Sequence, residues 1–488
     1  MLVNRARGST VNVSFLQELL NTIADQGRQL LPWTGKSGDA GKDIAELAKA
    51  LVSVRGEASG VAMARQILTI YRGLTSEQKR AFFHLLATAL QPREEAVIEA
   101  ASAYLSDPSP AALSKLQATV ESPRQEFFRR LNLAPGATGE IVAMRRDLLR
   151  MLASDPSLSV VDTDLRHLLY SWFNRGFLVL RRIDWQTPAA ILEKIIAYEA
   201  VHEIKGWDDL RRRLDPADRR CFAFFHPSLV DEPLIFVEVA LTDDMADNIA
   251  GLLDEAPKDG RAVEPTTAVF YSISNCQEGL KGISFGNFLI KQVVEELARE
   301  QPTLKTFVTL SPVPFFARWL ASELEEDQTG LVTPELRLAL QPLVHHDWLD
   351  DPEQVKTFEV PLTVLAAHYL VNAKSADGRP VDPVARFHLG NGARLERINW
   401  LADTSPKGLK ESHGVMVNYR YDLKEFERNH EAYANEGVVA ISRAVRSLLK
   451  TPLKIKAVRP EPQQLPPPPE VEEDEVEDAV EVVGPANR

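Results

Sequence analysis

The chain contains little cysteine and no long apolar run. Its 488 residues include two cysteines, Cys221 and Cys276, and no group of Cys and His residues has the spacing of a zinc site. No stretch approaches the roughly 20 consecutive apolar residues that a transmembrane helix needs. These absences exclude a disulfide-stapled secreted domain, a zinc finger and a membrane-spanning protein, and they suit a reducing compartment.

Targeting signals are missing as well. The first residues, MLVNRARGSTVNVSF, lack the long apolar segment of a secretory signal, and the last four, PANR, differ from the peroxisomal Ser-Lys-Leu. We therefore expect a cytoplasmic protein without a membrane partner.

Positive charge is not in excess. The chain has 56 Lys and Arg residues against 69 Asp and Glu residues, a net charge of −13 at pH 7. Residues 459–488 carry nine acids against two arginines, a net of −7, which leaves −6 for the other residues. The folded part is thus only mildly acidic, and no nucleic acid partner is predicted.

Two common nucleotide-binding motifs are also absent. The chain has neither the Gly-x-Gly-x-x-Gly of dinucleotide-binding folds nor the Gly-x-x-x-x-Gly-Lys-Ser/Thr of P-loops. The sequence therefore gives no support for a Rossmann-type dinucleotide site or a P-loop.

Three regions are distinguished by composition. Residues 12–178 repeat apolar side chains at helical steps between Pro- and Gly-containing breaks, whereas the following region alternates strand-like and helical runs. Four successive prolines and a dense acidic run cannot bury a core. We predict an α+β protein with a helical bundle at 1–180, a mixed α/β domain with a twisted open sheet at 186–452, and a disordered tail at 453–488.

Local signals refine this prediction. Thr75 and Thr187 are predicted to cap helices, and Arg145-Arg146 to lie on a solvated helix face. Strand-like runs at 221–225 and 234–241 have hairpin spacing, and a strand at 268–274 is followed by a helix at 284–299 and a strand at 304–310.

A glycine turn follows the strand at 268–274. Backbone amides at the start of the next helix form a natural phosphate site, and glycine allows a phosphate to approach closely. Gln277-Glu278-Gly279-Leu280-Lys281-Gly282 is a variant of Gln-x-x-Gly-x-Gly/Ala, the pyrophosphate-binding pattern of GNAT-type acyltransferases. Gln277, Gly279, Gly282 and Gly286 are therefore candidate substrate-binding residues, although a plain strand-to-helix turn explains the same residues.

A serine ends the next strand, in "FVTLSPVPFFARW". A serine nucleophile usually receives an oxyanion donor from the next backbone N–H, but Ser311 is followed by Pro312, which has none. A hydrogen-bonding or proton-handling role is therefore favoured for Ser311.

A second concentration of polar groups lies at 382–421. His388 stands between Phe387 and Leu389, an apolar setting that lowers the pKa of an imidazole, and the following glycines predict a loop. The alternative is a buried histidine whose hydrogen bonds are merely satisfied.

The motifs "YSISNCQEGLKGISFGNFLIKQVV", "TLSPVP", "HYL", "DPVARFHLGNGARLERINW" and "NYRY", in this order, resemble those of malonyl-CoA decarboxylases. The resemblance implies a GNAT-like catalytic domain that converts malonyl-CoA to acetyl-CoA and CO₂ with no cofactor, because coenzyme A is part of the substrate. It also implies a homo-oligomer, a tetramer built as a dimer of dimers, assembled partly through the helical domain.

The resemblance also implies roles for particular residues. Ser311, His388 and Tyr421 match catalytic or active-site positions of that family. Loss of CO₂ leaves an enolate that needs a proton donor. We expect Ser311 and His388 to orient the malonyl carboxylate, His388 to supply or relay the proton, and Tyr421 and Asn418 to position the carboxylate.

Two positions depart from the animal members of that family. Phe315 stands where they have glycine, and Ser284 stands where they have a glutamate implicated in the site, for which Glu278 is a speculative substitute. Two other functions remain open: a GNAT-type acyltransferase, for which no acceptor-amine site is visible, and a non-enzymatic helical scaffold with a degenerate ligand domain.

Overall fold

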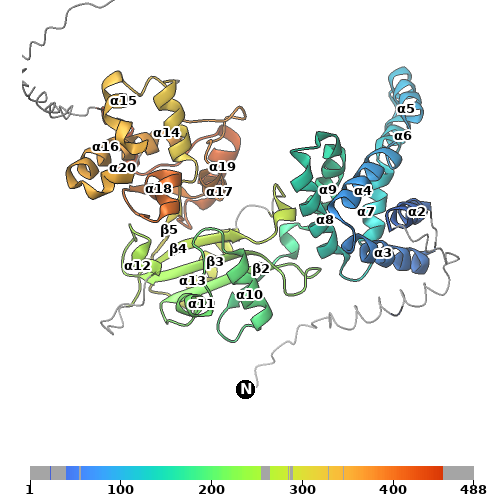
Figure 1. Ribbon diagram of the computed structural model, residues 1–488, viewed down its shortest axis with the longest axis horizontal. Coiled ribbons are helices and arrows are strands. Elements are labelled where there is room, and N and C mark those ends of the chain that lie inside the picture. Colours follow the sequence, from blue (N-terminus) through green and yellow to red (C-terminus); the bar gives the residue numbers. More distant parts are fainter. Residues whose placement is uncertain are drawn as a thin grey trace, which may run out of the picture.

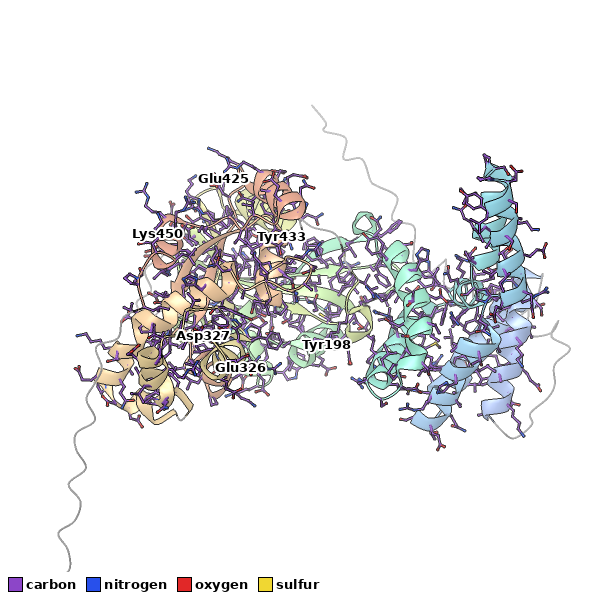
Figure 2. All side chains as sticks on the ribbon, turned by 90° about the horizontal axis from the view of Figure 1, so that it is seen from above. Tyr198, Glu326, Asp327, Glu425, Tyr433 and Lys450 are labelled. Carbon is purple, nitrogen blue, oxygen red and sulfur yellow. The ribbon has the colours of Figure 1, made fainter. Side chains whose placement is uncertain are left out.

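The computed structural model describes residues 40–453 apart from 54–55, 254–263, 284, 286–288, 328 and 345, together with Thr22. A helical region is followed by a mixed α/β region, as predicted, and the two lie side by side in both views (Figure 1; Figure 2). The predicted tail lies outside the described residues except at its first position. Within the described residues, no helix is both long and apolar enough to cross a membrane.

The helical region buries one shared apolar core, which includes Phe83, Leu86, Phe127 and Leu165. The predicted cap at Thr75 is confirmed, because its side chain and that of Gln78 form a reciprocal capping box. The helices are α2 (Ala40–Ser53), α3 (Glu57–Arg72), α4 (Ser76–Ala89), α5 (Glu94–Ser106), α6 (Pro110–Val120), α7 (Pro123–Leu131), α8 (Ala137–Leu152) and α9 (Ser159–Trp172). Figure 1 shows α5 and α6 projecting away from the others.

One mixed sheet organises the second region. Its order is β1-β2-β3-β4-β5-β8-β6, with β7 paired to β8. The predicted hairpin is confirmed as the antiparallel pair β2–β3, and the predicted strand–helix–strand unit as the parallel pair β4–β5. The strands are β1 (Val179–Ile183), β2 (Arg219–Phe225), β3 (Pro233–Thr242), β4 (Thr267–Asn275), β5 (Thr306–Thr309), β6 (Ser311–Pro312), β7 (Arg394–Asn399) and β8 (Met416–Arg420).

Helices cover both faces of this sheet because its central strands are apolar on both sides. Along β3, Ile235 and Val237 join the main core, whereas Phe236 packs with α10 and α11 on the other face. The helices are α10 (Ala189–Tyr198), α11 (Trp207–Leu214), α12 (Ala250–Leu253), α13 (Leu289–Glu300), α14 (Phe316–Glu325), α15 (Pro334–Leu340), α16 (Pro352–Val371), α17 (Pro383–Gly390), α18 (Pro406–Ser412), α19 (Phe426–Glu436) and α20 (Arg443–Leu448). Short 3₁₀ turns are η1 (Pro156–Leu158), η2 (Arg175–Phe177), η3 (Glu278–Leu280), η4 (Gln341–Val344) and η5 (His346–Asp350).

One predicted helix start is wrong, and a second lies outside the described residues. The N-cap of α10 is Pro188, and the hydroxyl of Thr187 instead accepts a hydrogen bond from the backbone N–H of Asp184. The helix after the glycine turn is described over Leu289–Glu300, and its predicted start at 284 lies outside the described residues.

The helical region is joined to the sheet through Arg145 of α8. This side chain is 1% exposed, so the predicted solvated face is wrong at this residue. Its guanidinium donates to the carbonyl oxygens of Gly279 and Lys281 at 2.7 and 3.0 Å. A Cβ on Gly279 would lie 1.9 Å from the carbonyl oxygen of Val142, so the glycine allows α8 and the turn to touch.

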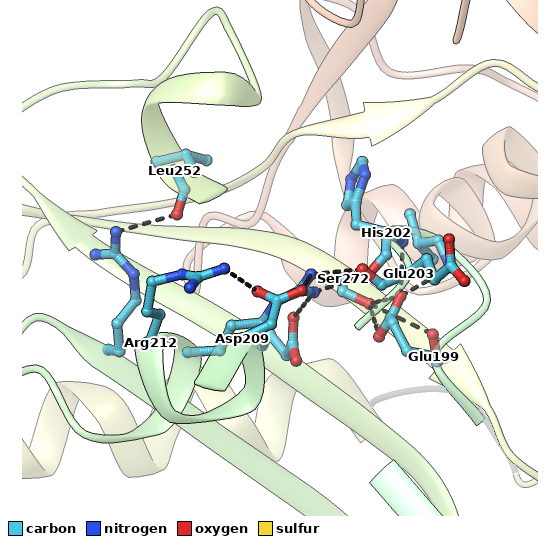
Figure 3. Close-up of polar contacts among 12 residues, drawn as sticks. Glu199, His202, Glu203, Asp209, Arg212, Leu252 and Ser272 are labelled. Carbon is cyan, nitrogen blue, oxygen red and sulfur yellow. Dashed lines mark hydrogen bonds and ion pairs between the residues drawn. The ribbon is translucent and has the colours of Figure 1, made fainter. Parts of the chain in front are cut away.

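A separate buried polar network, drawn in Figure 3, lies between α11 and the sheet. Arg213 donates to the carbonyl oxygens of His202 and Glu203 at 2.9 and 3.0 Å. It also donates to Glu238 at 3.1 Å. Burial raises the pKa of Glu238 to about 8, and the Arg213 guanidinium opposes part of that rise. Each of these two buried groups thus depends on the other.

The contact at the glycine turn gives a stability prediction. Gly279→Ala should destabilise the protein by about 2 kcal/mol, because the added methyl overlaps a backbone carbonyl that has no room to move away. Thermal unfolding measures the effect. Gly251→Ala is the control, because a Cβ there meets no atom within 4 Å. Equal melting temperatures for the two variants would contradict the proposed contact.

The buried Arg213–Glu238 pair gives a second prediction. Arg213→Leu should destabilise the protein by about 3 kcal/mol, because it leaves a buried carboxyl group without its partner. The double variant Arg213→Leu/Glu238→Leu should recover much of that loss. Melting temperatures of the three proteins check this, and a double variant less stable than Arg213→Leu alone would refute it.

Candidate active site

Three predicted site residues from distant parts of the chain meet in the structure. Ser311 Oγ lies 3.0 Å from His388 Nε2, and His388 Nδ1 lies 2.7 Å from the hydroxyl of Tyr421. Ser311 begins β6, His388 lies in α17, and Tyr421 directly follows β8. The fold therefore brings together the serine, the histidine and the tyrosine that the sequence singled out.

The directions of these hydrogen bonds follow from the available protons. Ser311 donates its single hydroxyl proton to Thr309 Oγ1 at 2.8 Å, so its oxygen accepts from His388 Nε2. A neutral imidazole carries one N–H, so Nδ1 accepts from the hydroxyl of Tyr421. One directed chain thus runs from the phenol through the imidazole and the serine hydroxyl to the threonine.

Burial keeps the residues of this hydrogen-bonded chain uncharged. His388 is 2% exposed and Tyr421 is 1% exposed. Burial lowers the pKa of His388 to about 3, because imidazolium loses its hydration there. Burial also raises the pKa of Tyr421 well above its ordinary value. Both side chains are therefore neutral near pH 7, and the phenol retains the proton that it donates.

Two residues that support this hydrogen-bonded chain were not predicted. Tyr419 stacks on the His388 ring with centroids 4.5 Å apart, and its backbone N–H donates to Thr309 Oγ1 at 3.1 Å. The alternation of strand residues could have pointed to both, because Thr309 lies two positions before Ser311 and Tyr419 two before Tyr421. Neither residue type alone indicates a site.

Asn418 is close to the site but fully engaged with protein groups. Its amide donates to the carbonyl oxygens of Thr309 and Ala246 at 2.7 and 3.0 Å. Its own oxygen accepts from Arg397 and Asn399 at 3.0 and 2.9 Å. The predicted contact with a substrate carboxylate would therefore cost an existing hydrogen bond.

The local sequence explains how His388 is held. Asp382 caps α17 by accepting from the backbone N–H of Ala385 at 2.8 Å, and Pro383 occupies the first helical position. His388 thus lies in the last turn of a helix, and the predicted loop begins only after it. Gly392, in that loop, has φ +77° and packs against the backbone of Phe426, where a side chain would not fit.

A cavity of about 420 Å³ lies between α17 and the glycine turn, and its lining does not include Ser311, His388 or Tyr421. Its lining includes Gln277 and Gly282, two of the candidate substrate-binding residues, and Phe387, which precedes His388 in α17. Lys281 and Arg386 add two cations to the lining. Arg386 was not predicted, although it lies only two residues before His388.

The remaining predicted residues lie in different places. Gly279 borders the turn but packs on α8, and Gly286 and Ser284 lie outside the described residues. Glu278 lines the cavity, with its carboxylate paired to Arg150 at 2.6 Å. Phe315 is exposed and stacks with Arg318. Within the described ranges, no group of three or more His, Cys, Asp or Glu side chains could hold a metal ion.

The chain matches both parts of one protein family. Residues 176–459 match the malonyl-CoA decarboxylase C-terminal domain, and residues 90–173 match the malonyl-CoA decarboxylase N-terminal domain. Curated relatives include the mitochondrial malonyl-CoA decarboxylases of Anser anser anser and Mus musculus. The goose protein is 38% identical over 353 residues, 66% of this chain and 68% of the relative. The mouse protein is 38% identical over 347 residues, 66% of this chain and 70% of the relative.

Solved structures agree with these matches. Malonyl-CoA decarboxylase from Rhodopseudomonas palustris is 54% identical with a TM-score of 0.81, covering 83% of this chain and 99% of its own. The enzyme from Cupriavidus metallidurans is 36% identical with a TM-score of 0.66, covering 84% of this chain and 100% of its own. The chain therefore belongs to the malonyl-CoA decarboxylase family of carboxy-lyases.

Proposed function

We propose that this chain converts malonyl-CoA to acetyl-CoA and CO₂ at the chain of hydrogen bonds through Ser311, His388 and Tyr421. The observation that carries the proposal is this uncharged, buried chain of hydrogen bonds, in which His388 belongs to α17, the helix that also lines the cavity at the glycine turn. Family membership supplies the substrate and the reaction type. The residue roles below are inferred from the geometry.

The cavity has room for the pantetheine part of the substrate. The thioester would lie near α17, and the pantetheine arm of the ligand would extend toward Gln277 and Gly282. Lys281 and Arg386 provide positive charge for the diphosphate, and Gly286 is proposed to contact the substrate as the sequence suggests. Gly279 contributes by shaping the turn, because it allows the close contact with α8.

Ser311 is proposed to bind the malonyl carboxylate. A small rotation of its hydroxyl away from Thr309 would direct the proton at a carboxylate oxygen, while His388 Nε2 continues to fix the serine oxygen. A carboxylate in a dry site is poorly hydrated, and loss of CO₂ spreads its charge into the thioester enolate. Asn418 supports this arrangement by holding Thr309, rather than by binding the carboxylate itself.

His388 is proposed to deliver the proton that ends the reaction. The C–C bond to the carboxylate breaks, its electrons form the enolate, and the enolate carbon takes the proton from Nε2, directly or through Ser311. Tyr421 passes its proton to Nδ1 as Nε2 gives its own proton up. After the product leaves, Nε2 takes a proton from solvent and Nδ1 returns its proton to Tyr421, which restores the starting state. A neutral imidazole suits this step because its N–H is present throughout the neutral pH range.

Other features are proposed from the resemblance. A GNAT-like catalytic fold and a homo-oligomeric assembly through the helical region belong to this group, and so does a cytoplasmic location. The goose and mouse relatives are mitochondrial, so a fractionation experiment on the native protein is needed to test the location.

Purified protein incubated with malonyl-CoA should form acetyl-CoA without any amine acceptor. Chromatography of the thioesters, run with and without an amine, separates this reaction from acyl transfer. An acyl-amine product would favour the acyltransferase alternative. Binding of malonyl-CoA without turnover would favour a non-enzymatic protein.

His388→Ala should lower kcat about 10²- to 10⁴-fold, the usual contribution of a positioned proton donor. Ser311→Ala should lower kcat about 100-fold, and Tyr421→Phe about tenfold, because the phenylalanine removes only the hydrogen bond to Nδ1. His84→Ala, at a partly exposed histidine paired with Asp155, is the control and should keep full activity. Full kcat in His388→Ala would overturn the residue roles but not the reaction.

The pH profile tests the neutral imidazole. Burial lowers the pKa of His388 to about 3, so the ring is already neutral above that pH and loses no further proton near 6.5. The profile of kcat/KM, which reports the free enzyme, should therefore show no histidine step between about pH 5 and 8. A step that His388→Ala abolishes would contradict the assignment.

A further inference from the structure

A second cavity, of about 250 Å³, lies on the other side of the glycine turn. Its lining combines one face of α9 with the last two residues of the turn: Thr163, Arg166, His167, Tyr170, Gly282 and Ile283. The four α9 residues follow the spacing i, i+3, i+4 and i+7 and are all exposed, so they lie on one helix face without filling a core. None of the proposed catalytic steps uses this face of α9.

The position of α9 beside the turn is fixed by buried contacts. Arg145 donates to Asp162 of α9 at 2.7 Å and to the carbonyl oxygens of Gly279 and Lys281 in the turn. Asp162 precedes Arg166 by one helical turn, so the same contact sets where Arg166 lies. The second cavity is thus built by the joint between the helical region and the sheet.

The two cavities are continuous in their lining. Gly282 and Ile283 border both, so a long ligand that leaves the first cavity past the turn meets α9 next. Coenzyme A has this shape, with a pantetheine arm, a diphosphate and then an adenosine that carries a 3′-phosphate. In the proposed complex, the arm lies in the first cavity and the diphosphate lies at the turn. The phosphorylated nucleoside then still needs a binding site.

The chemistry of the α9 face fits that nucleoside. Arg166 makes no hydrogen bond or ion pair within the part of the chain that the structure describes, so its five N–H donors are available for a phosphate. His167 can donate to the same phosphate. Tyr170 is 63% exposed and offers an aromatic ring on which an adenine can stack.

We propose that Arg166, His167 and Tyr170 of α9 bind the 3′-phosphoadenosine end of malonyl-CoA, so that the helical region forms part of the substrate site. This inference rests on the proposed function. Its consequence is selectivity, because a malonyl thioester without the nucleotide gains nothing from α9. The turn and the first cavity would hold the other parts of both substrates equally.

Arg166→Ala should raise KM for malonyl-CoA about tenfold, the size expected when a charge-assisted hydrogen bond is lost, and should leave kcat unchanged. KM for malonyl-pantetheine, which lacks the nucleotide, should not change. Arg72→Ala is the matched control, because Arg72 is an exposed arginine of the helical region whose partner is Glu140. An unchanged KM for malonyl-CoA, or an equal rise for both substrates, would overturn the proposal.

A binding measurement separates this inference from the proposed reaction. Adenosine 3′,5′-bisphosphate should bind the wild-type protein in calorimetry, and Arg166→Ala should weaken that binding about tenfold. Tyr170→Ala should weaken it as well, through lost stacking. This result does not require turnover, so an inactive protein that binds the bisphosphate through Arg166 would refute the reaction alone. Equal binding by wild type and Arg166→Ala would refute the α9 site alone.

Discussion

The pairing of β8 with its neighbours is the constraint on which the candidate active site depends. This strand pairs with β5, β6 and β7, and so places Tyr419 and Tyr421 beside the strand that carries Thr309. Thr309 then accepts hydrogen bonds from the hydroxyl of Ser311 and from the backbone of Tyr419. A shift of β8 by one residue would reverse which side chains face this point, and the geometry of the candidate site would be lost.

The low polarity of the site follows from that packing and determines its chemistry. His388 lies between the ring of Tyr419 and two hydroxyl groups, with its charged form disfavoured by burial. A charged imidazole would attract the malonyl carboxylate strongly but would also stabilise it before CO₂ is lost. In the proposed mechanism, a neutral donor chain orients the substrate, and the proton remains available for the enolate.

The glycine turn contacts the helical region and also borders both cavities. Close packing at Gly279 and the hydrogen bonds from Arg145 hold the turn against α8. Gly282, with φ +77°, borders both cavities. The helical region therefore contacts the turn directly. Its buried contacts determine how the turn is presented to a ligand, and its α9 face extends the proposed substrate site.

The sequence alone determined the helical and mixed regions, the β2–β3 hairpin, the parallel β4–β5 unit and the residues Ser311, His388 and Tyr421, because periodicity and motif order are local properties. The prediction from the sequence was wrong for Arg145, because its charge favoured a solvent-exposed helix face whereas the side chain is buried. Tertiary structure decided the partners: Thr309 for Ser311, the Tyr419 ring for His388, and the carbonyl oxygens of the turn for Arg145. Such contacts join residues far apart in the chain, so their energies depend on strand pairing and burial rather than on neighbouring residues.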